Sequence, residues 1–208
     1  MGEAEARAYV AARCDEAAMA RLDEFTASLI GENGVQNLIA KPTEATVWQR
    51  HLADSAQLLD HVPRETAGLW LDLGAGAGFP GIVVAIMRPE WTVRLVESRN
   101  RRIEWLRSIT AQLRLTNCQI DGERLELLDS FEAAVISARA FAPMPKLLDL
   151  SARFSTSDTI WLLPKGRSAA QEVESLPRPL RAMFHVEQSD TDDSAGIVVG
   201  TGKVELKP

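Results

Sequence analysis

The chain has 208 residues, of which a quarter are charged, and a net charge of −6, so it has room for one domain with a sizeable core and an N-terminal extension. No apolar run approaches the roughly 18 residues of a membrane span, and the acidic, alanine-rich N-terminus is a poor targeting signal. Cys14, Cys118 and the three histidines lack the spacing of metal ligands. We therefore expect a cytoplasmic protein with reduced thiols, no membrane partner and no metal.

Two helices are predicted in residues 1–62. In residues 5–30, apolar side chains recur at spacings of three and four, which indicates an amphipathic helix that ends at two nearby glycines. Thr43 can cap a second helix over residues 44–59. We expect these helices to form a cap on the domain that follows.

Strand and helix patterns alternate after residue 63. The predicted strands are residues 69–73, 93–96, 118–121, 133–137 and 159–163, and the predicted helices run to 87 and over 100–113, 146–154 and 169–176. Such alternation predicts a parallel, doubly wound sheet. Residues 183–188 and 197–204, joined by a polar loop, predict a terminal antiparallel hairpin.

The most informative stretch is Asp72-Leu73-Gly74-Ala75-Gly76-Ala77-Gly78-Phe79-Pro80-Gly81, which follows the first predicted strand. Glycines let the backbone turn sharply and approach a ligand, and the next helix presents unpaired N–H groups to it. Glu97 ends the second predicted strand, 19 positions after Gly78. At that distance a carboxylate meets ribose hydroxyls, so the stretch predicts a nucleotide-cofactor site.

Two cofactor classes share this geometry. Gly76-x-Gly78-x-x-Gly81 satisfies the dinucleotide pattern, which alone is weak evidence, and a dinucleotide enzyme needs a substrate domain for which the chain has little room. An acid two residues before the first glycine is typical of class I S-adenosylmethionine methyltransferases. We favour this second class over the first and over a glycine-rich turn without a ligand, because unused glycines only weaken a domain.

Charge is unevenly distributed along the chain. Residues 1–34 carry three arginines and seven acids, whereas residues 88–114 carry seven arginines and three acids. A local basic face can bind phosphate even when the whole protein is acidic. A solvated helix face explains the arginines equally well, so the pattern leaves nucleic-acid binding open.

Seven short motifs follow one another in a specific order and spacing. They are Asn37-Leu38, Arg50-His51-Leu52-x-Asp54-Ser55, the glycine run from Asp72 to Gly81, Glu97-Ser98, Arg124-Leu125-Glu126, Ala138-Arg139-Ala140-Phe141 and Lys165-Gly166. Together they resemble, over nearly the full chain, the RsmG (GidB) family of bacterial 16S ribosomal RNA guanine-N7 methyltransferases.

The resemblance implies a fold and a reaction. The fold class is α/β, a class I methyltransferase with a Rossmann-like doubly wound sheet, a C-terminal antiparallel hairpin and an N-terminal helical cap, divided into a cap (1–62) and a single compact core (63–208). The implied cofactor is S-adenosylmethionine, with S-adenosylhomocysteine as product. The implied acceptor is N7 of guanine-527 in the 530 loop of 16S rRNA, in the small ribosomal subunit.

The resemblance also implies roles for the matching residues. Those expected to bind the cofactor are Asp72, Gly74, Gly76, Gly78, Phe79, Glu97, Leu125, Glu126 and Arg139. Those expected to position the acceptor, without a general base, are Arg139, Lys165, Asn37 and His51. Those expected to bind RNA phosphates are Arg124, Lys165, Arg101 and Arg102.

Most of these residues have a simpler explanation. His51 and Asp54 lie three apart on a predicted helix and can form a local hydrogen-bonded pair. Asn37 can be a turn residue, Arg139 can belong to a surface salt bridge, and Lys165 can end a strand.

Two other functions stay open. A small-molecule methyltransferase suits the acidic net charge, and a nucleotide-sensing module without catalysis suits the glycine loop. We expect a monomer, since no apolar strip is left over once cap and core are filled, and we place all five tryptophans in the core or at its rim.

Overall fold

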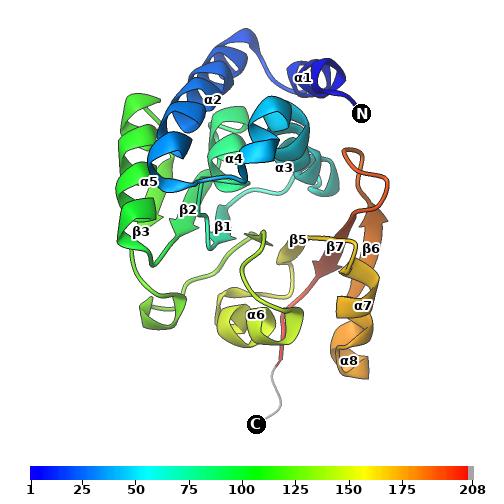
Figure 1. Cartoon of the computed structure of the whole chain (residues 1–208). Helices are drawn as coiled ribbons and strands as arrows, with labels where there is room; N and C mark the ends of the chain where they lie inside the picture. Colours follow the sequence, from blue (N-terminus) through cyan, green and yellow to red (C-terminus); the bar gives the residue numbers. More distant parts are fainter. Residues whose placement is uncertain (206–208) are drawn as a thin grey trace.

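The computed structural model describes residues 1–205, and the end of the predicted core, 206–208, lies outside this part. A seven-stranded sheet in the order β3-β2-β1-β4-β5-β7-β6 forms its centre (Figure 1). The strands are β1 (Leu69–Leu73), β2 (Thr92–Val96), β3 (Cys118–Asp121), β4 (Val135–Ala138), β5 (Ile160–Gly166), β6 (Phe184–Gln188) and β7 (Gly196–Thr201). Strands β1 to β5 pair in parallel, and β7 runs antiparallel to both of its neighbours. The predicted doubly wound sheet with a terminal hairpin is confirmed.

Helices cover both faces of this sheet. The α-helices are α1 (Glu3–Ala11), α2 (Glu16–Gln36), α3 (Asp54–Ala56), α4 (Gly81–Met87), α5 (Asn100–Gln112), α6 (Met144–Ser151), α7 (Ala169–Glu174) and α8 (Arg178–Arg181). In Figure 1, α2 and α4 lie above the strands and α6 lies below them. The short helix α8 was not predicted, and the helix predicted over 169–176 ends at Glu174.

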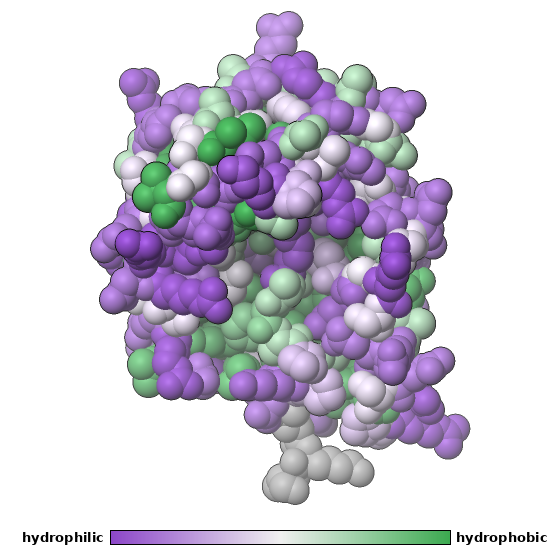
Figure 2. Space-filling model, in the orientation of Figure 1, coloured by the Kyte–Doolittle hydropathy of each residue, from purple (hydrophilic) through white to green (hydrophobic). Residues whose placement is uncertain are grey.

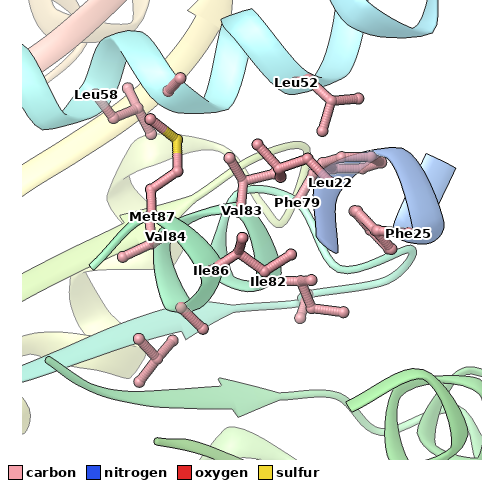
Figure 3. Close-up of a cluster of buried hydrophobic side chains, with 14 of the residues drawn as sticks. Leu22, Phe25, Leu52, Leu58, Phe79, Ile82, Val83, Val84, Ile86 and Met87 are labelled. Carbon is pink, nitrogen blue, oxygen red and sulfur yellow. The ribbon is translucent and has the colours of Figure 1, made fainter. Parts of the chain in front are cut away.

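Helix α4 is buried on every side. All seven of its residues are buried, so it needs a second layer beyond the sheet. Side chains of α2, such as Leu22 and Phe25, and of the segment that carries Leu52 and Leu58 surround it (Figure 3). The N-terminal helices therefore complete the core, and Phe25 of α2 packs against Phe79 in the glycine loop, with ring centroids 5.3 Å apart.

The prediction of one helix over residues 5–30 is wrong. The chain breaks after α1, and α2 begins where the Asp15 side chain accepts a backbone N–H at 2.7 Å as an N-cap. Helix α2 then passes through both glycines to Gln36, because a solvent-exposed helix tolerates glycine at a cost of about 1 kcal/mol. It ends at Asn37, whose φ of 43° is a left-handed conformation that asparagine adopts more readily than most residues.

The second predicted helix spans more residues and is irregular. Residues 41–61 are helical throughout but pass from a 3-10 turn, η1 (Lys41–Thr46), into a π-helical turn, η2 (Trp48–Ala53), then through α3 into a 3-10 turn, η3 (Gln57–His61). Thr43 is not its cap. Instead the Glu3 carboxylate of α1 accepts the first two N–H groups of η2, from Trp48 at 2.8 Å and Gln49 at 2.9 Å.

The face of the molecule drawn in Figure 2 is mostly hydrophilic. On this face, hydrophobic residues occur in small groups. Large exposed apolar side chains in residues 1–205 are Met1, Ile30, Val35, Leu127 and Val186. All five tryptophans are buried, as predicted. Among the described helices none is long and apolar enough to cross a membrane.

Candidate active site

Two cavities adjoin at the carboxyl ends of the parallel strands, where ligands collect in sheets of this kind. The first, of about 470 Å³, lies over the loop after β1, and we call it the glycine-loop cavity. The second, of about 720 Å³, lies between η2 and the ends of β5 and β7, and we call it the π-turn cavity. They share a wall formed by residues 139–142, directly after β4.

The glycine loop is held in a shape that only glycine adopts easily. Gly74, Gly76 and Gly78 have φ values of 68°, 55° and 109°. A Cβ on Gly78 would lie 2.5 Å from Cδ1 of Ile82, so this glycine also packs directly on α4. The loop thus brings bare backbone to the cavity.

Asp72 fixes the loop from beneath. Its carboxylate is fully buried; Oδ2 accepts the Gly81 N–H at 2.9 Å and Oδ1 accepts the Ser137 hydroxyl at 2.8 Å. Ser137 in turn accepts the Trp70 indole N–H at 2.8 Å, which leaves its own proton for Asp72. Burial raises the pKa of Asp72 to about 7, although these hydrogen bonds and Arg139 act against the rise. Asp72 ties strand to helix and does not line either cavity.

Glu97 joins the glycine loop to the end of β2. Its Oε2 accepts the Gly76 N–H at 3.1 Å, while Oε1 accepts those of Ser98 at 2.7 Å and Arg99 at 2.9 Å. A carboxylate offers about four acceptor positions, so one remains for a donor inside the cavity that Glu97 lines. A ribose hydroxyl is such a donor.

The remaining walls of the glycine-loop cavity are apolar within and charged at the rim. Its larger apolar lining residues are Leu38, Phe79, Val96, Leu125, Phe141 and Leu150, and its charged ones include Arg99, Glu123, Arg124, Glu126 and Lys146. Sequence reasoning missed Arg99, Glu123 and Lys146. The first two lie within two residues of a predicted site residue, so proximity along the chain was a usable signal for them; Lys146 had none.

Arg139 lies in the shared wall and lines both cavities. Its Nη1 donates to Nδ1 of His51 at 3.1 Å and to the carbonyl of Arg50 at 3.3 Å, and it lies 3.5 Å from Oδ2 of Asp54. The guanidinium carbon lies 5.0 Å from the ring centroid of Phe79. Within residues 1–205, its Nε and Nη2 make no hydrogen bond. One nitrogen therefore anchors Arg139, and the other two can serve a ligand.

The hydrogen bonds of His51 define its tautomer. Thr43 donates its only hydroxyl proton to the carbonyl of Ala40 at 2.7 Å, so its oxygen accepts from Nε2 of His51 at 2.8 Å. Nδ1 is then the acceptor for Arg139. Burial, with the charges of Arg139 and Arg50, lowers the pKa of His51 to about 3, so the ring is neutral at neutral pH. A direct His51–Asp54 hydrogen bond is wrong as an explanation, since each contacts Arg139 instead.

This fold and sequence match known proteins. The model of the family described as "GidB: rRNA small subunit methyltransferase G" matches residues 18–192. The chain is 61% identical, over 98% of both chains, to "Ribosomal RNA small subunit methyltransferase G" of Erythrobacter litoralis (strain HTCC2594). The chain belongs to the rRNA small subunit methyltransferase G family. A second relative of the same name, from Sphingopyxis alaskensis, is 54% identical over 90% of this chain and 80% of its own.

The fold is also that of solved methyltransferases. Precorrin-6y C5,15-methyltransferase from Geobacter metallireducens superposes with a TM-score of 0.54 at 14% identity, over 81% of this chain and 92% of that chain. At this identity the likeness concerns the fold alone, the class I S-adenosylmethionine-dependent methyltransferase fold. Fold and family together imply S-adenosylmethionine as the cofactor. The glycine-loop cavity fits it, because bare backbone, an apolar wall and the open acceptor position of Glu97 converge there.

Most residues predicted to bind the cofactor lie together in this member of the rRNA small subunit methyltransferase G family. The glycine-loop cavity is lined by Gly74, Gly76, Phe79, Glu97, Leu125, Glu126 and Arg139, and also by Arg102 and Arg124, which were predicted to bind RNA. Gly78 and Asp72 support the loop without lining it. His51, Arg139 and Lys165 line the π-turn cavity.

Other predicted residues lie elsewhere or are already paired. Asn37 lines neither cavity. It ends α2, which agrees with the alternative interpretation of Asn37 as a turn residue. Its carbonyl accepts a hydrogen bond from Nη2 of Arg102 at 2.6 Å. Lys165 donates to the carbonyl of Ala142 at 2.8 Å and pairs with Glu172 at 3.0 Å. Arg102, which also lines the glycine-loop cavity, and Lys165 thus both have partners within the protein, and their contact with RNA phosphates stays a prediction. Arg101 is exposed but lines neither cavity.

Across residues 1–205, no group of three or more His, Cys, Asp or Glu side chains is arranged to hold a metal ion.

The arginine-rich stretch, residues 88–114, is only partly available to bind phosphate. Arg94 forms an ion pair with Asp121 at 2.8 Å, whereas Arg99, Arg101 and Arg107 are exposed.

Proposed function

We propose that the protein transfers a methyl group from S-adenosylmethionine to N7 of a guanine in the 530 loop of 16S rRNA. Membership in the rRNA small subunit methyltransferase G family supports the ribosomal substrate. The observation that carries the proposal is the pair of adjoining cavities with Arg139 in their common wall. Such a pair can hold a methyl donor and a base on either side of the point of transfer.

The glycine-loop cavity holds the cofactor in this proposal. When bound, S-adenosylmethionine supplies an electrophilic methyl group on a sulfonium. The backbone at Gly74 and Gly76 would hold its methionine part, and Glu97 would accept a ribose hydroxyl at its remaining acceptor position. Leu125 and Glu126, which line the same cavity, would flank its adenine.

The π-turn cavity takes the guanine. Guanine N7 carries a lone pair and no proton, so the reaction needs alignment and electrostatics rather than a general base. This agrees with a neutral His51 whose two nitrogens are both occupied. The two available nitrogens of Arg139 can donate to guanine O6, which leaves N7 free for the methyl group. The base leaves its stack to enter the cavity.

The RNA backbone contacts the rim of the two cavities. Arg99, Arg124 and Lys146 are exposed at the rim of the glycine-loop cavity, and Arg101 is exposed on the same helix as Arg102. Such cations bind phosphates without reading sequence, and affinity then falls as salt rises. Arg102 contributes by holding the connector after α2, and Lys165 by bracing the wall at Ala142.

We further propose that the protein works as a monomer in the cytoplasm without a metal. The large exposed apolar side chains, such as Val35, Leu127 and Val186, belong to separate elements. We also propose that residues 1–62 act as a cap on the core, 63–208. This cap supplies η2, and with it His51, to the acceptor side.

The test is methylation of the natural particle. Small ribosomal subunits from cells that lack the family's methyltransferase are incubated with labelled S-adenosylmethionine and the protein, and the label is mapped by cleavage at N7-methylguanine. We expect one labelled guanine in the 530 loop. Tight cofactor binding without any label would instead favour a small-molecule acceptor or a nucleotide-sensing module.

A further inference from the structure

A buried polar cluster joins the β6–β7 loop to the helical segment of residues 41–61. Gln57, Ser189 and Thr191 are each at most 3% exposed. The Gln57 Oε1 accepts the Asp190 N–H at 2.8 Å, and its Nε2 donates to Ser189 Oγ at 3.2 Å. Burying polar groups is costly unless each is paired, so such a cluster is kept only with a fully connected network.

The cluster converges on one oxygen of Asp54. Oδ1 accepts Nε2 of Gln57 at 3.0 Å and the hydroxyl of Thr191 at 3.0 Å. These two donors fix the plane of the carboxylate. The other oxygen, Oδ2, lies 3.5 Å from Nη1 of Arg139. Gln57 and Thr191 therefore set the orientation of Asp54 through Oδ1, and this orientation determines where Oδ2 lies relative to Arg139.

Arg139 needs such a constraint. A free arginine side chain has many rotamers, so holding it in one geometry costs entropy. The Arg139 guanidinium lies over Phe79 at the junction of two cavities. His51 and the Arg50 carbonyl each accept one hydrogen bond from Nη1. Asp54 adds a charge on the same nitrogen, which keeps Nε and Nη2 directed away from the helical segment.

We propose that Asp54 is a positioning residue for Arg139, and that Thr191 and Gln57 set its direction, so that the β6–β7 loop controls the acceptor side of the site. This rests on the proposed function, in which Arg139 contacts the guanine. The loop does not need Thr191 Oγ1 for attachment. Arg50 already pairs with Asp192 at 2.8 Å, and Gln49 donates to the Thr191 carbonyl at 3.0 Å.

The experiment compares variants on small ribosomal subunits. Asp54→Asn removes the charge at nearly constant shape, and Thr191→Val removes one donor from a residue that lines neither cavity. Ser194→Ala, in the same loop and bonded to Asp192, is the matched control. We expect kcat to fall ~30-fold in Asp54→Asn and ~5-fold in Thr191→Val, because small misplacements of a positioning group are costly to rate. Affinity for S-adenosylhomocysteine should change less than about twofold in each variant, and Ser194→Ala should behave as wild type.

A second measurement separates positioning from general stability. Asp54→Asn is repeated in an Arg139→Lys background. If Asp54 acts through Arg139, the second substitution should lower kcat by less than a further factor of about two. If the two substitutions lower kcat independently, so that their fold-losses multiply in the double variant, the proposal is overturned. A loss of kcat that merely follows the fraction of unfolded protein would also overturn it. If Asp54→Asn does not fold, normal kcat in Thr191→Val overturns it. A wild-type protein that leaves the subunits unmethylated would instead contradict the proposed function.

Discussion

The glycine-loop cavity and the π-turn cavity are built by different means. The first depends on backbone in one run of ten residues, 72–81, fastened by Asp72 and Glu97. The second depends on side chains that meet from far apart: Arg139 and His51 are 88 positions apart, and Thr191 and Asp54 are 137 apart. A backbone site tolerates little change in its glycines, whereas a side-chain site can lose one contact at a time. The two sides should therefore respond differently to substitution.

The largest effect is expected in the glycine loop. A Cβ on Gly81 would overlap Cδ2 of Leu95 and lie 2.9 Å from Oδ2 of Asp72, so Gly81→Ala should destabilise the fold by about 3 kcal/mol. The control Gly34→Ala meets nothing within 4 Å on exposed α2 and should stabilise it by about 0.5–1 kcal/mol. Urea unfolding measures both. Equal stabilities of the two variants would show that the loop accommodates side chains.

The next effect separates the two cavities by function. Arg139→Lys keeps a cation but loses the planar fork that anchors with one nitrogen and donates with two, so kcat on small subunits should fall ~100-fold. Affinity for S-adenosylhomocysteine, measured by calorimetry, should remain within about threefold. Arg99→Lys, at the rim, is the control and should retain most activity. A collapse of cofactor affinity in Arg139→Lys would mean that the shared wall belongs chiefly to the glycine-loop cavity.

A third substitution tests the fastening of the glycine loop. Glu97→Gln places an amide N–H₂ group against at least one of three backbone N–H donors, those of Gly76, Ser98 and Arg99. Because a donor then faces a donor, the loop loses a hydrogen bond, and S-adenosylhomocysteine should bind ~30-fold more weakly, a change of about 2 kcal/mol. Glu123→Gln removes a charge from the same cavity rim and should change affinity less than threefold. Similar losses in both variants would indicate that charge, rather than loop geometry, matters.

The smallest effect concerns pH and His51. Its folded pKa of about 3 lies below the ordinary value, so between pH 6.5 and 3 the unfolded chain binds the extra proton and stability falls as pH falls. From pH 7 to 5 this should cost about 1.9 kcal/mol. Asp72, with a raised pKa of about 7, has the opposite dependence, since its stabilisation is lost as pH rises.

The comparison of wild type with His51→Asn isolates the histidine. Asparagine can present an oxygen acceptor to Arg139 but does not titrate, while Asp72 is common to both proteins. Urea unfolding at pH 5, 6 and 7 should show that the stability of wild type relative to His51→Asn falls towards acid. Parallel curves would mean that His51 is protonated as easily in the folded protein as in the unfolded chain.

The same contrast explains what could be predicted from sequence. The strands and the terminal hairpin could be predicted because apolar runs and their alternation with helices are local patterns; β3, for instance, has the predicted bounds of 118–121. The N-terminal helices could not, because their boundaries depend on the Asp15 cap and on Glu3, which supplies acceptors to a helix 45 positions away.

In the site, the glycine loop and Glu97 were predictable because their spacing follows from one strand-loop-helix unit. The state of a charged side chain was not. Both Lys165 and Arg124 form an ion pair, but the pair of Lys165 with Glu172 is largely buried, whereas Arg124 pairs with Glu126 at the surface and its side chain remains 70% exposed. No local pattern distinguishes the largely buried cation from the exposed one.

The β6–β7 loop also has a consequence for the order of assembly during folding. Contacts between residues 54 and 191 close one of the longest loops in the chain, and such contacts form late because closing a long loop costs entropy first. Without the docked residue 191, Asp54 would keep only one of the two donors to its Oδ1, while the hydrogen bonds of the glycine loop would be unchanged. The acceptor side therefore depends on the native topology of nearly the whole chain, whereas the glycine loop depends on a short part of it.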